Sequence, residues 1–243
     1  MRVNGEVIRR GAVPVTATDR VILGAPPAVF PSVLRLVHED DDLLVVDKPA
    51  GLLTIATERE RHRTAYRMLR DYVAAQPGGQ RIFIVHRLDR DTSGVLVFAK
   101  SERVKRALQA QFEARTTERV YVAVVEGRVA AGEGTLRARV SEDPRSLRVR
   151  AGQRGREAVT RYRVLERRAH STVLEVRLET GRRGQIRAQL AALGHPIVGD
   201  AQFGSRRDPV RRVCLHAARL GFVDGTGRAR VYESPAPAAF VRA

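Results

Sequence analysis

Two apolar segments enclose the polar stretch His86-Arg87-Leu88-Asp89-Arg90-Asp91-Thr92-Ser93-Gly94. The segments are residues 82–85 and 95–99, and both are rich in Ile, Val and Phe, which is typical of buried β-strands. A polar loop between two such strands is held firmly at both ends, and reactive groups are disproportionately found on loops of this kind. We therefore expect residues 86–94 to carry the chemistry of the protein.

The two carboxylates of this loop leave two interpretations open. In an extended chain Asp89 and Asp91 lie on the same side, about 6.6 Å apart, and two carboxylates about 5–9 Å apart are what glycosidic-bond cleavage uses. From local chemistry alone, the safer interpretation is a turn in which the Asp side chains bind nearby backbone N–H groups. Ser93 and His86 make no convincing nucleophile–base pair, because no third group orients the base.

The rest of the chain predicts more strands than helices. Three helices are expected, one beginning at Thr64 and stopped by Pro77-Gly78-Gly79, one from Ser101 to Phe112, and a short one over residues 185–193 with Gly194 at its C′ position. Strands are expected at residues 33–37, 43–46, 82–85, 95–99, 120–125, 136–140, 158–165, 173–178, 215–223 and 230–232. Because helices do not alternate regularly with the strands, the pattern indicates an α+β fold with a mixed or antiparallel sheet.

The charge of the chain indicates nucleic acid as its partner. The 243 residues include 44 basic and 27 acidic side chains, for a net charge of +17, and all basic residues except Lys48, Lys100 and Lys105 are arginines. Arginine favours bidentate contacts with phosphate. A hydrophobic content of 43% is enough for a real core, so the chain is expected to fold.

Several residue types exclude other classes of protein. A single cysteine, Cys214, excludes a disulfide scaffold and a cysteine-based zinc site and fits a reducing cytoplasm. The acidic run at residues 39–42 is expected to be a solvated turn and not a metal site. No leader-like or membrane-spanning segment is predicted. The absence of Trp argues against a cleft built on aromatic stacking.

The stretch at residues 86–94 resembles the active-site signature of the RluA-type pseudouridine synthases, His-Arg-Leu-Asp-x-x-Thr-Ser-Gly. All seven fixed positions match: His86, Arg87, Leu88, Asp89, Thr92, Ser93 and Gly94. Further blocks that resemble the family follow in order over residues 33–243, at residues 46–52, 119–127, 155–162, 180–200 and 215–222. The resemblance implies the α+β catalytic fold of that family, with a long, mostly antiparallel sheet flanked by helices and loops.

The resemblance also implies an activity, the isomerisation of specific uridines in RNA to pseudouridine without any cofactor or metal. It assigns the catalytic carboxylate to Asp89 and a basic partner, expected to form an ion pair with it, to Arg187. Tyr121 matches a Tyr that packs against the target base and helps to move the proton from carbon 5. These three residues are the predicted catalytic set.

The target nucleotide must leave the RNA stack before its glycosidic bond is accessible, at a cost of a few kcal/mol. Arg87 is expected to fill the vacated space by stacking, or alternatively to contact a phosphate. Arg182 and Arg183, at the start of the short helix, are expected to bind phosphate. His86, Thr92 and Ile186 complete the predicted substrate-binding set.

The third active-site block departs from the family pattern. Gly184 and Gln189 stand where the family has two His residues, which leaves the packing around Arg187 open. Phe203 stands where Tyr is common. His195 and His216 are expected to make structural hydrogen bonds, and Cys214 to be a buried apolar residue.

The chain is expected to form two parts. Residues 1–28 predict a hairpin that resembles part of a small RNA-binding module, with a linker at Ala25-Pro26-Pro27 near the end of this range. Residues 29–243 predict the catalytic domain. The partner is expected to be ribosomal or transfer RNA, without a membrane, and the protein a cytoplasmic monomer. Two alternatives remain: a non-catalytic RNA-binding or ribosome-assembly protein, and a glycosidase that uses Asp89 and Asp91.

Overall fold

A small sheet lies near the N-terminus. The computed structural model describes residues 2–4, 6–7, 14–19, 21–22, 28–58, 60–76, 78–143 and 149–243. Strand β1 (Arg2–Val3) pairs antiparallel with β2 (Glu6–Val7) and with β3 (Val21–Ile22). Gly5 in the predicted hairpin, and the predicted linker at Ala25-Pro26-Pro27, lie outside the described residues. The division into a module over residues 1–28 and a catalytic domain over 29–243 stays a prediction.

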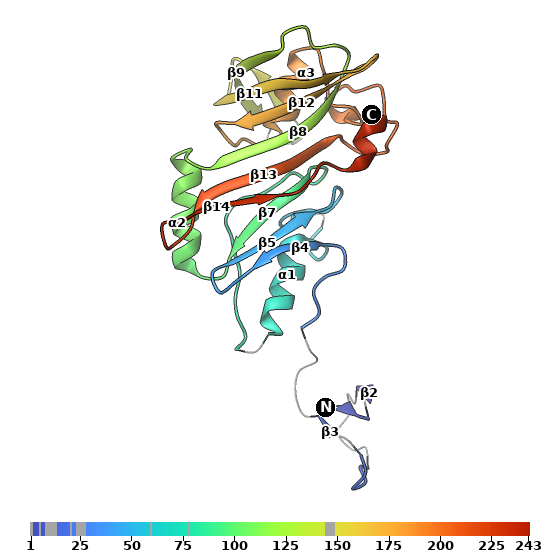
Figure 1. Ribbon diagram of the computed structural model, residues 1–243, viewed down its shortest axis with the longest axis vertical. Coiled ribbons are helices and arrows are strands. Elements are labelled where there is room, and N and C mark those ends of the chain that lie inside the picture. Colours follow the sequence, from blue (N-terminus) through green and yellow to red (C-terminus); the bar gives the residue numbers. More distant parts are fainter. Residues whose placement is uncertain are drawn as a thin grey trace.

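The other described elements form the body of the protein (Figure 1). Its helices are α1 (Ala65–Ala74), α2 (Glu102–Glu113) and α3 (Gln185–Ala192), with short 3-10 helices η1 (Ala201–Phe203) and η2 (Ala238–Arg242). Its strands are β4 (Arg35–Glu39), β5 (Leu43–Lys48), β6 (Phe83–Ile84), β7 (Ser93–Ala99), β8 (Glu118–Glu126), β9 (Glu133–Glu142), β10 (Val149–Gly152), β11 (Arg156–Arg167), β12 (Ser171–Leu178), β13 (Leu215–Val223) and β14 (Ala229–Glu233). Within the described residues, no helix has both the length and the apolar character needed to cross a bilayer.

These strands form one mixed sheet in the order β10-β9-β11-β12-β8-β13-β7-β5-β4, with β14 beside β13 and β6 beside β7. Every neighbouring pair is antiparallel except β7 and β13, where Ser93 lies opposite His216 and Gly94 opposite Ala217. This parallel contact joins the half of the sheet formed by β4, β5 and β7 to the half formed by β8–β12. It also fixes the end of the loop that carries Asp89, because the loop leads directly into β7.

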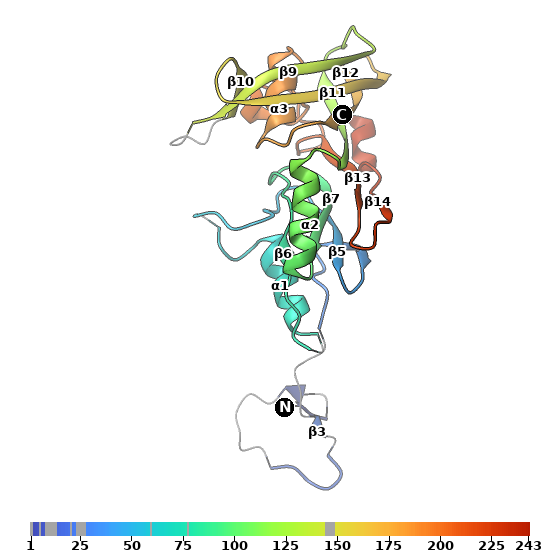
Figure 2. The same ribbon diagram turned by 90° about the vertical axis from the view of Figure 1, so that its left-hand side faces the viewer.

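The first two helices begin at the predicted caps. The Thr64 hydroxyl accepts the N–H of Arg67 in α1, and the Ser101 hydroxyl accepts the N–H of Val104 in α2. Helix α2 packs against β6, β7 and β13, whereas α3 packs against β9 and β10 at the other end of the sheet (Figure 2). Helix α2 therefore packs on both strands of the junction between the halves, whereas α3 packs on the half formed by β8–β12.

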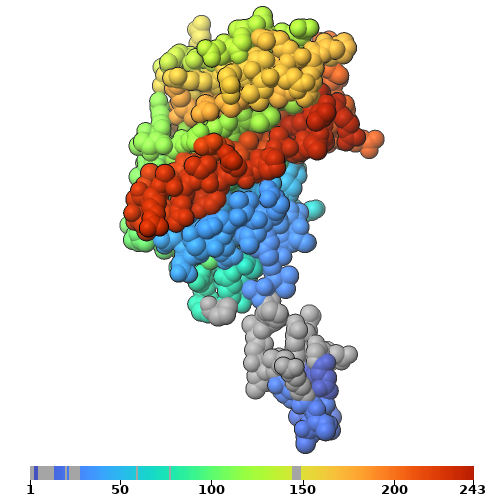
Figure 3. Space-filling view, viewed as in Figure 1, coloured from blue at the N-terminus to red at the C-terminus, as the bar shows by residue number. Residues whose placement is uncertain are grey.

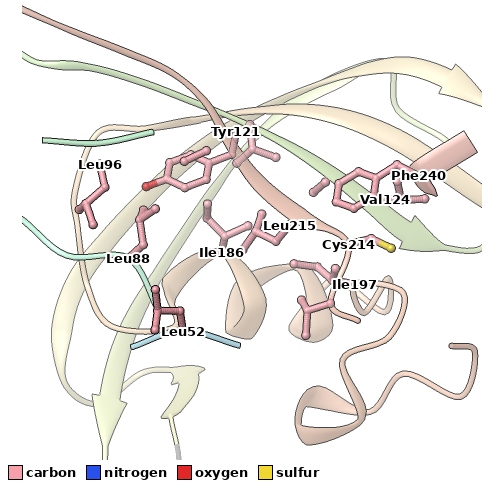
Figure 4. Packing of buried hydrophobic residues seen from close by; sticks show 14 of the residues in the cluster. Leu52, Leu88, Leu96, Tyr121, Val124, Ile186, Ile197, Cys214, Leu215 and Phe240 are labelled. Atoms are coloured by element: carbon pink, nitrogen blue, oxygen red, sulfur yellow. The ribbon is translucent and has the colours of Figure 1, made fainter. Parts of the chain in front are cut away.

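The core follows the apolar strands. Strand β7 is buried along its whole length, and β5 at five of its six positions, since each carries a continuous apolar run. The largest buried cluster continues from these strands through β8 and β12 to α3 (Figure 4). On the face seen in Figure 3, the red segment that contains β14 crosses the molecule between the blue β4–β5 region and the gold β11–β12 region.

The predicted α+β class and mostly antiparallel mixed sheet are confirmed, and most elements lie where periodicity placed them. Two expectations need correction. The strand predicted at residues 82–85 is only Phe83–Ile84, because the chain there already bends toward the loop at residue 86. Strand β10 was not predicted, since its four residues include only two apolar side chains.

We predict that Gly94→Ala destabilises the protein strongly. Gly94 has φ +117°, and a Cβ there would lie 2.2 Å from the carbonyl oxygen of Ala217 across the parallel contact. Backbone strain of about 1–3 kcal/mol and a similar packing cost should add in the free energy of unfolding, measured by urea denaturation. Gly204→Ala is the matched control, since Gly204 has φ +93° but no neighbour within 4 Å. Equal losses in the two variants would contradict the role given to the β7–β13 contact.

Candidate active site

One cleft of about 610 Å³ lies at the junction of the two halves of the sheet. Its walls come from the loop at residues 86–92, from the start of β8, from the end of α2 and from the segment at residues 180–187. All nine residues predicted for the site line this cleft: Asp89, Tyr121, Arg187, Arg87, His86, Thr92, Arg182, Arg183 and Ile186. The fold thus brings together four segments that are far apart in the sequence.

Backbone anchors hold the loop on both sides of Asp89. The Thr54 hydroxyl donates to the carbonyl of Leu88 at 2.8 Å and accepts its N–H at 3.2 Å. On the other side, the N–H of Gly51 donates to the carbonyl of Arg90 at 2.8 Å. Because Leu88 is also buried in the core, the position of Asp89 is set by the residues on either side of it.

Lys48 lies beneath this loop and is completely buried. Its ammonium donates to the carbonyls of Pro49, Leu52 and Arg90, at 2.9, 2.7 and 3.2 Å. Burial lowers the pKa of Lys48 to about 7, although the carboxylates of Asp91 and Asp89 oppose that shift. The sequence placed Lys48 in a family-like block, but it did not show that the side chain of Lys48 holds the loop that carries Asp89.

The carboxylate of Asp89 meets the beginning of α3. One carboxylate oxygen accepts the N–H of Gly184 at 3.2 Å, and Gly184 is the residue before the first turn of that helix. Unpaired N–H groups at a helix N-terminus stabilise a negative charge. Gly184 has φ +60°, in the left-handed region that glycine adopts without strain, so the departure from the family's His here fits the local backbone.

The predicted ion pair between Arg187 and Asp89 is wrong. Arg187 instead makes a bidentate pair with Asp200, with its Nε and one Nη at 2.6 and 2.7 Å from the two carboxylate oxygens. Burial alone would lower the pKa of Arg187, but the hydrogen bonds and charge of Asp200, followed by Asp89 and Asp91, raise it. Arg187 therefore stays a cation near Asp89 without a direct bond to it, and its guanidinium also lies over Phe203, at 4.7 Å.

Tyr121 belongs to the floor of the cleft. Its ring is buried and lies above Leu88 and Ile186, with Leu215 close by (Figure 4). Burial raises the pKa of Tyr121 to about 12, with a lowering effect of Arg119 and a raising effect of Asp89. The phenol is therefore protonated at neutral pH.

His86 lies in the wall of the cleft as a neutral ring. It stacks on Phe112 with 4.8 Å between ring centres, and its Nε2 accepts the N–H of Val97 at 3.2 Å. Burial, together with the charge of Arg119, lowers the pKa of His86 to about 3. An uncharged ring that already accepts a backbone hydrogen bond supports the shape of the wall and adds no positive charge to it.

The arginines at the rim differ in their partners. Arg87 is exposed and has no hydrogen bond or ion pair among the described residues. Arg182 donates through Nε to the carbonyl of Glu157, and Arg183 pairs with the carboxylate of Glu142. Thr92 is buried, and its N–H donates to the carbonyl of Asp89, so it closes the loop turn from within.

Gln189, the second departure from the family pattern, has a clear structural role. Its carbonyl accepts from the Thr160 hydroxyl at 2.6 Å, and its amide donates to the carbonyls of Leu136 and Ala158. The side chain therefore fastens α3 to β9 and β11. This answers the question that the sequence left open about the packing of the helix that carries Arg187.

The other singled-out side chains lie outside the cleft. Nδ1 of His216 accepts the hydroxyl of Ser93 at 2.8 Å while Ser93 accepts from Arg212, and Nδ1 of His195 lies 2.8 Å from the carbonyl of Glu126. Both His residues thus make the structural hydrogen bonds that were expected. Cys214 is buried, and burial raises the pKa of its thiol to about 11.

Asp91 is not part of the cleft lining. Its side chain is 41% exposed, and its carboxylate lies 3.9 Å from the guanidinium of Arg187. Asp89 is thus the one member of the candidate carboxylate pair that lines the cleft. This arrangement does not support the glycosidase alternative, which needs both carboxylates on one substrate.

Sequence reasoning missed several residues of the cleft. Phe112, Glu142, Thr180 and Gln185 all line it, as does Arg119. The sequence did contain a signal for Arg119. It lies two positions before Tyr121 on the same strand, so the two side chains face the same side. The others are brought in only by tertiary packing.

Comparison with known proteins agrees with this fold. A family model described as RNA pseudouridylate synthase matches residues 42–192. An uncharacterised RNA pseudouridine synthase of Bacillus subtilis is 34% identical over 98% of this chain and 82% of its own length. A ribosomal large subunit pseudouridine synthase D of Xanthomonas campestris is 47% identical over 70% of this chain and 52% of its own length. The human RNA pseudouridylate synthase domain containing 4 has the same fold, with a TM-score of 0.71 and 22% identity over 85% of this chain and 90% of its own.

These matches identify the class of the protein as an RNA-modifying isomerase. The chain belongs to the RNA pseudouridylate synthase family, and the predicted RluA type is confirmed. The chain spans 62% and 58% of two further relatives, the ribosomal large subunit pseudouridine synthases D of Nitrosomonas europaea and Xylella fastidiosa.

We predict that Asp200→Asn lowers the free energy of unfolding by about 3–5 kcal/mol, because it leaves the buried charge of Arg187 without its partner. Asp91→Asn is the control, since its contact with Arg187 is longer and more exposed, and should cost less than about 1 kcal/mol. Urea denaturation at neutral pH measures both. Similar losses would show that Asp200 is not the main partner of Arg187.

We predict that His86 makes the protein less stable as the pH falls. Because the folded protein holds the pKa near 3 while the unfolded chain has about 6.5, only the unfolded chain binds this proton between those values. Stability is therefore complete above pH 6.5 and is lost toward pH 3, by up to about 1.4 kcal/mol per pH unit. The difference in unfolding free energy between wild type and His86→Gln, followed by urea denaturation, should decrease over this range. A difference independent of pH would contradict a neutral, half-buried His86.

Proposed function

We propose that the protein isomerises uridine in RNA to pseudouridine within this cleft, with Asp89 as the catalytic carboxylate. The observation that carries the proposal is the position of Asp89, which lines the cleft while its oxygen accepts the N–H of Gly184. The reaction breaks the bond between the sugar and nitrogen 1, turns the base, and joins carbon 5 to the same sugar carbon. Every role open to the carboxylate in this reaction requires its ionised form.

Two groups with positive charge lie near the carboxylate of Asp89. The N-terminus of α3 supplies an N–H group and a positive dipole end, and Arg187 supplies a fixed positive charge nearby. Arg187 contributes this charge without bonding to Asp89, because Asp200 binds it. The carboxylate of Asp89 is thus left free to meet the sugar or the base, whereas a direct ion pair would compete with the substrate.

Tyr121 is proposed to pack against the target base. Its ring forms the floor of the cleft, and its hydroxyl is protonated at neutral pH because burial raises its pKa to about 12. A protonated phenol donates a hydrogen bond and is a poor acceptor of the proton from carbon 5. The position of Tyr121 therefore supports the packing role more than the proton-transfer role.

The cleft is of a size that suits an everted nucleotide. A volume of about 610 Å³ lies within the range of about 300–1,000 Å³ that is usual for small-molecule sites. We propose that Arg87, which is exposed beside Asp89, occupies the space that the nucleotide leaves in the RNA. His86, Thr92 and Ile186 shape the cleft, and Arg182 and Arg183 contact the RNA at the rim.

The substrate is proposed to be ribosomal RNA, with transfer RNA as the second candidate. Several relatives carry the name ribosomal large subunit pseudouridine synthase, in forms C and D. The cytoplasmic location and the monomeric state stay predictions. A non-catalytic RNA-binding protein, the alternative function, would use the same basic cleft. The enzyme and the binding protein differ in whether uridine is converted to pseudouridine.

We predict that Asp89→Asn lowers the rate of pseudouridine formation at least about 100-fold, because the amide neither ionises nor attacks. Tritium release from ribosomal RNA labelled at carbon 5 of uridine measures the rate. Asp91→Asn, which changes an exposed carboxylate outside the cleft lining, should keep most of the activity. Wild-type rates in Asp89→Asn would rule out the mechanism, and no release by the wild type with intact RNA binding would favour the non-catalytic alternative.

A further inference from the structure

Arg119 is a buried cation in the wall of the cleft. It is only 9% exposed, and it stands on β8 two residues before Tyr121, so the two side chains lie on the same face of the strand. The cleft that contains Asp89 and Tyr121 is also lined by Arg119. Neither the predicted catalytic set nor the predicted substrate-binding set includes it.

The hydrogen bonds of Arg119 are incomplete. One terminal nitrogen, Nη2, donates to the carbonyls of Leu178 and Glu179, at 3.2 and 3.1 Å. Its Nε is buried without a hydrogen-bond partner, and Nη1 has none among the described residues. The guanidinium is therefore held along one edge only, and most of its donor capacity is unused.

No carboxylate neutralises the charge of Arg119. Among the described residues it forms no ion pair within 4 Å, in contrast to Arg187 with Asp200 and Arg183 with Glu142. Burial lowers the pKa of Arg119, and Arg115 adds to that effect, while Tyr121 opposes it. A cation that is buried without a counter-charge is costly unless an anion joins it.

The segment opposite Arg119 leaves room for it. A Cβ on Gly181 would lie 2.8 Å from Nη1 of Arg119, although the backbone of Gly181 needs no left-handed conformation. Glycine at this position thus leaves room for the neighbouring guanidinium, and its own backbone conformation is open to other residues. Because Gly181 also lines the cleft, Nη1 lies directly behind the surface that a ligand would meet.

We infer that Arg119 binds a backbone phosphate of the RNA next to the everted nucleotide, with Nη1 as the donor. The inference rests on the proposed function, which brings an RNA strand into the cleft. A phosphate supplies both the missing acceptor and the missing negative charge, whereas a uracil carbonyl would supply the acceptor alone. The Phe112 ring, 5.6 Å from the guanidinium, and the neutral ring of His86 close the other side.

The first test replaces Arg119 and measures binding of a short oligouridylate over a range of salt concentrations. Arg119→Gln should weaken binding about 10- to 100-fold. It should also reduce the slope of log affinity against log salt by about 0.7, the value for one phosphate contact on a single strand. Arg119→Lys, which keeps the charge, should recover most of the slope. In the rate assay the loss should appear in KM more than in kcat.

The second test leaves Arg119 in the sequence and moves it. Gly181→Ala should push Nη1 aside, since the clashing atom is the end of a flexible side chain, and it should therefore weaken binding and reduce the salt slope while the melting temperature stays near that of the wild type. Gly132→Ala is the matched control, because nothing lies within 4 Å of its Cβ position and its φ is ordinary. This control should bind as the wild type does.

Two outcomes would overturn the inference. Unchanged affinity in both Arg119→Gln and Gly181→Ala would show that Arg119 does not meet the RNA. Weaker binding with an unchanged salt slope would show a contact with the base instead of a phosphate. Neither outcome depends on catalysis, because binding is measured directly. Asp89→Asn should keep the wild-type salt slope of binding. A failure of the proposed activity is therefore distinguishable from a failure of the phosphate contact.

Discussion

The buried ammonium of Lys48 is the contact on which the site depends. It joins the end of β5, the carbonyls of Pro49 and Leu52, and the carbonyl of Arg90 inside the loop that carries Asp89. Burying a cation costs free energy, and here the nearby Asp carboxylates oppose only part of the effect of burial on the pKa of Lys48. Since the same loop runs directly into the parallel contact of β7 with β13, one buried side chain ties the position of Asp89 to the junction of the two halves of the sheet.

The arginines of the cleft fall into two groups with different consequences. Arg187 and Arg183 are each paired with a carboxylate, so part of their charge is already balanced within the protein. Arg87 and Arg119 have no carboxylate partner among the described residues, and they are free to attract an anion. The net charge of +17 therefore reaches the substrate through only some of the arginines. The net charge counted from a sequence indicates the sign of the partner's charge. The pattern of ion pairs in the structure indicates which arginines can hold that partner.

Local patterns predicted what depends on neighbouring residues. Thr64 and Ser101 cap helices because a hydroxyl before an apolar periodic run accepts the first free N–H groups, and the signature at residues 86–94 located the cleft. Long-range choices were not predictable in this way. Arg187 had three carboxylates within reach, and only the packing of α3 against η1 decides that Asp200 binds it. Arg119 was missed because an arginine at the start of an apolar strand usually faces solvent, and its burial depends on α2 and the segment at residue 181.

The pairing of Arg187 with Asp200 explains how the carboxylate that we propose as catalytic can have a cation nearby and remain available. A direct bond to Asp89 would stabilise the charge but would also occupy the oxygens that the substrate must reach. With Nε and Nη2 bound by Asp200, the guanidinium cannot turn toward Asp89, and its positive charge acts on the cleft from a fixed position. The N–H of Gly184 supplies the one direct hydrogen bond to the carboxylate of Asp89 within the described residues. Gly184 takes the left-handed conformation that places this N–H at the start of α3, a conformation that glycine adopts without strain.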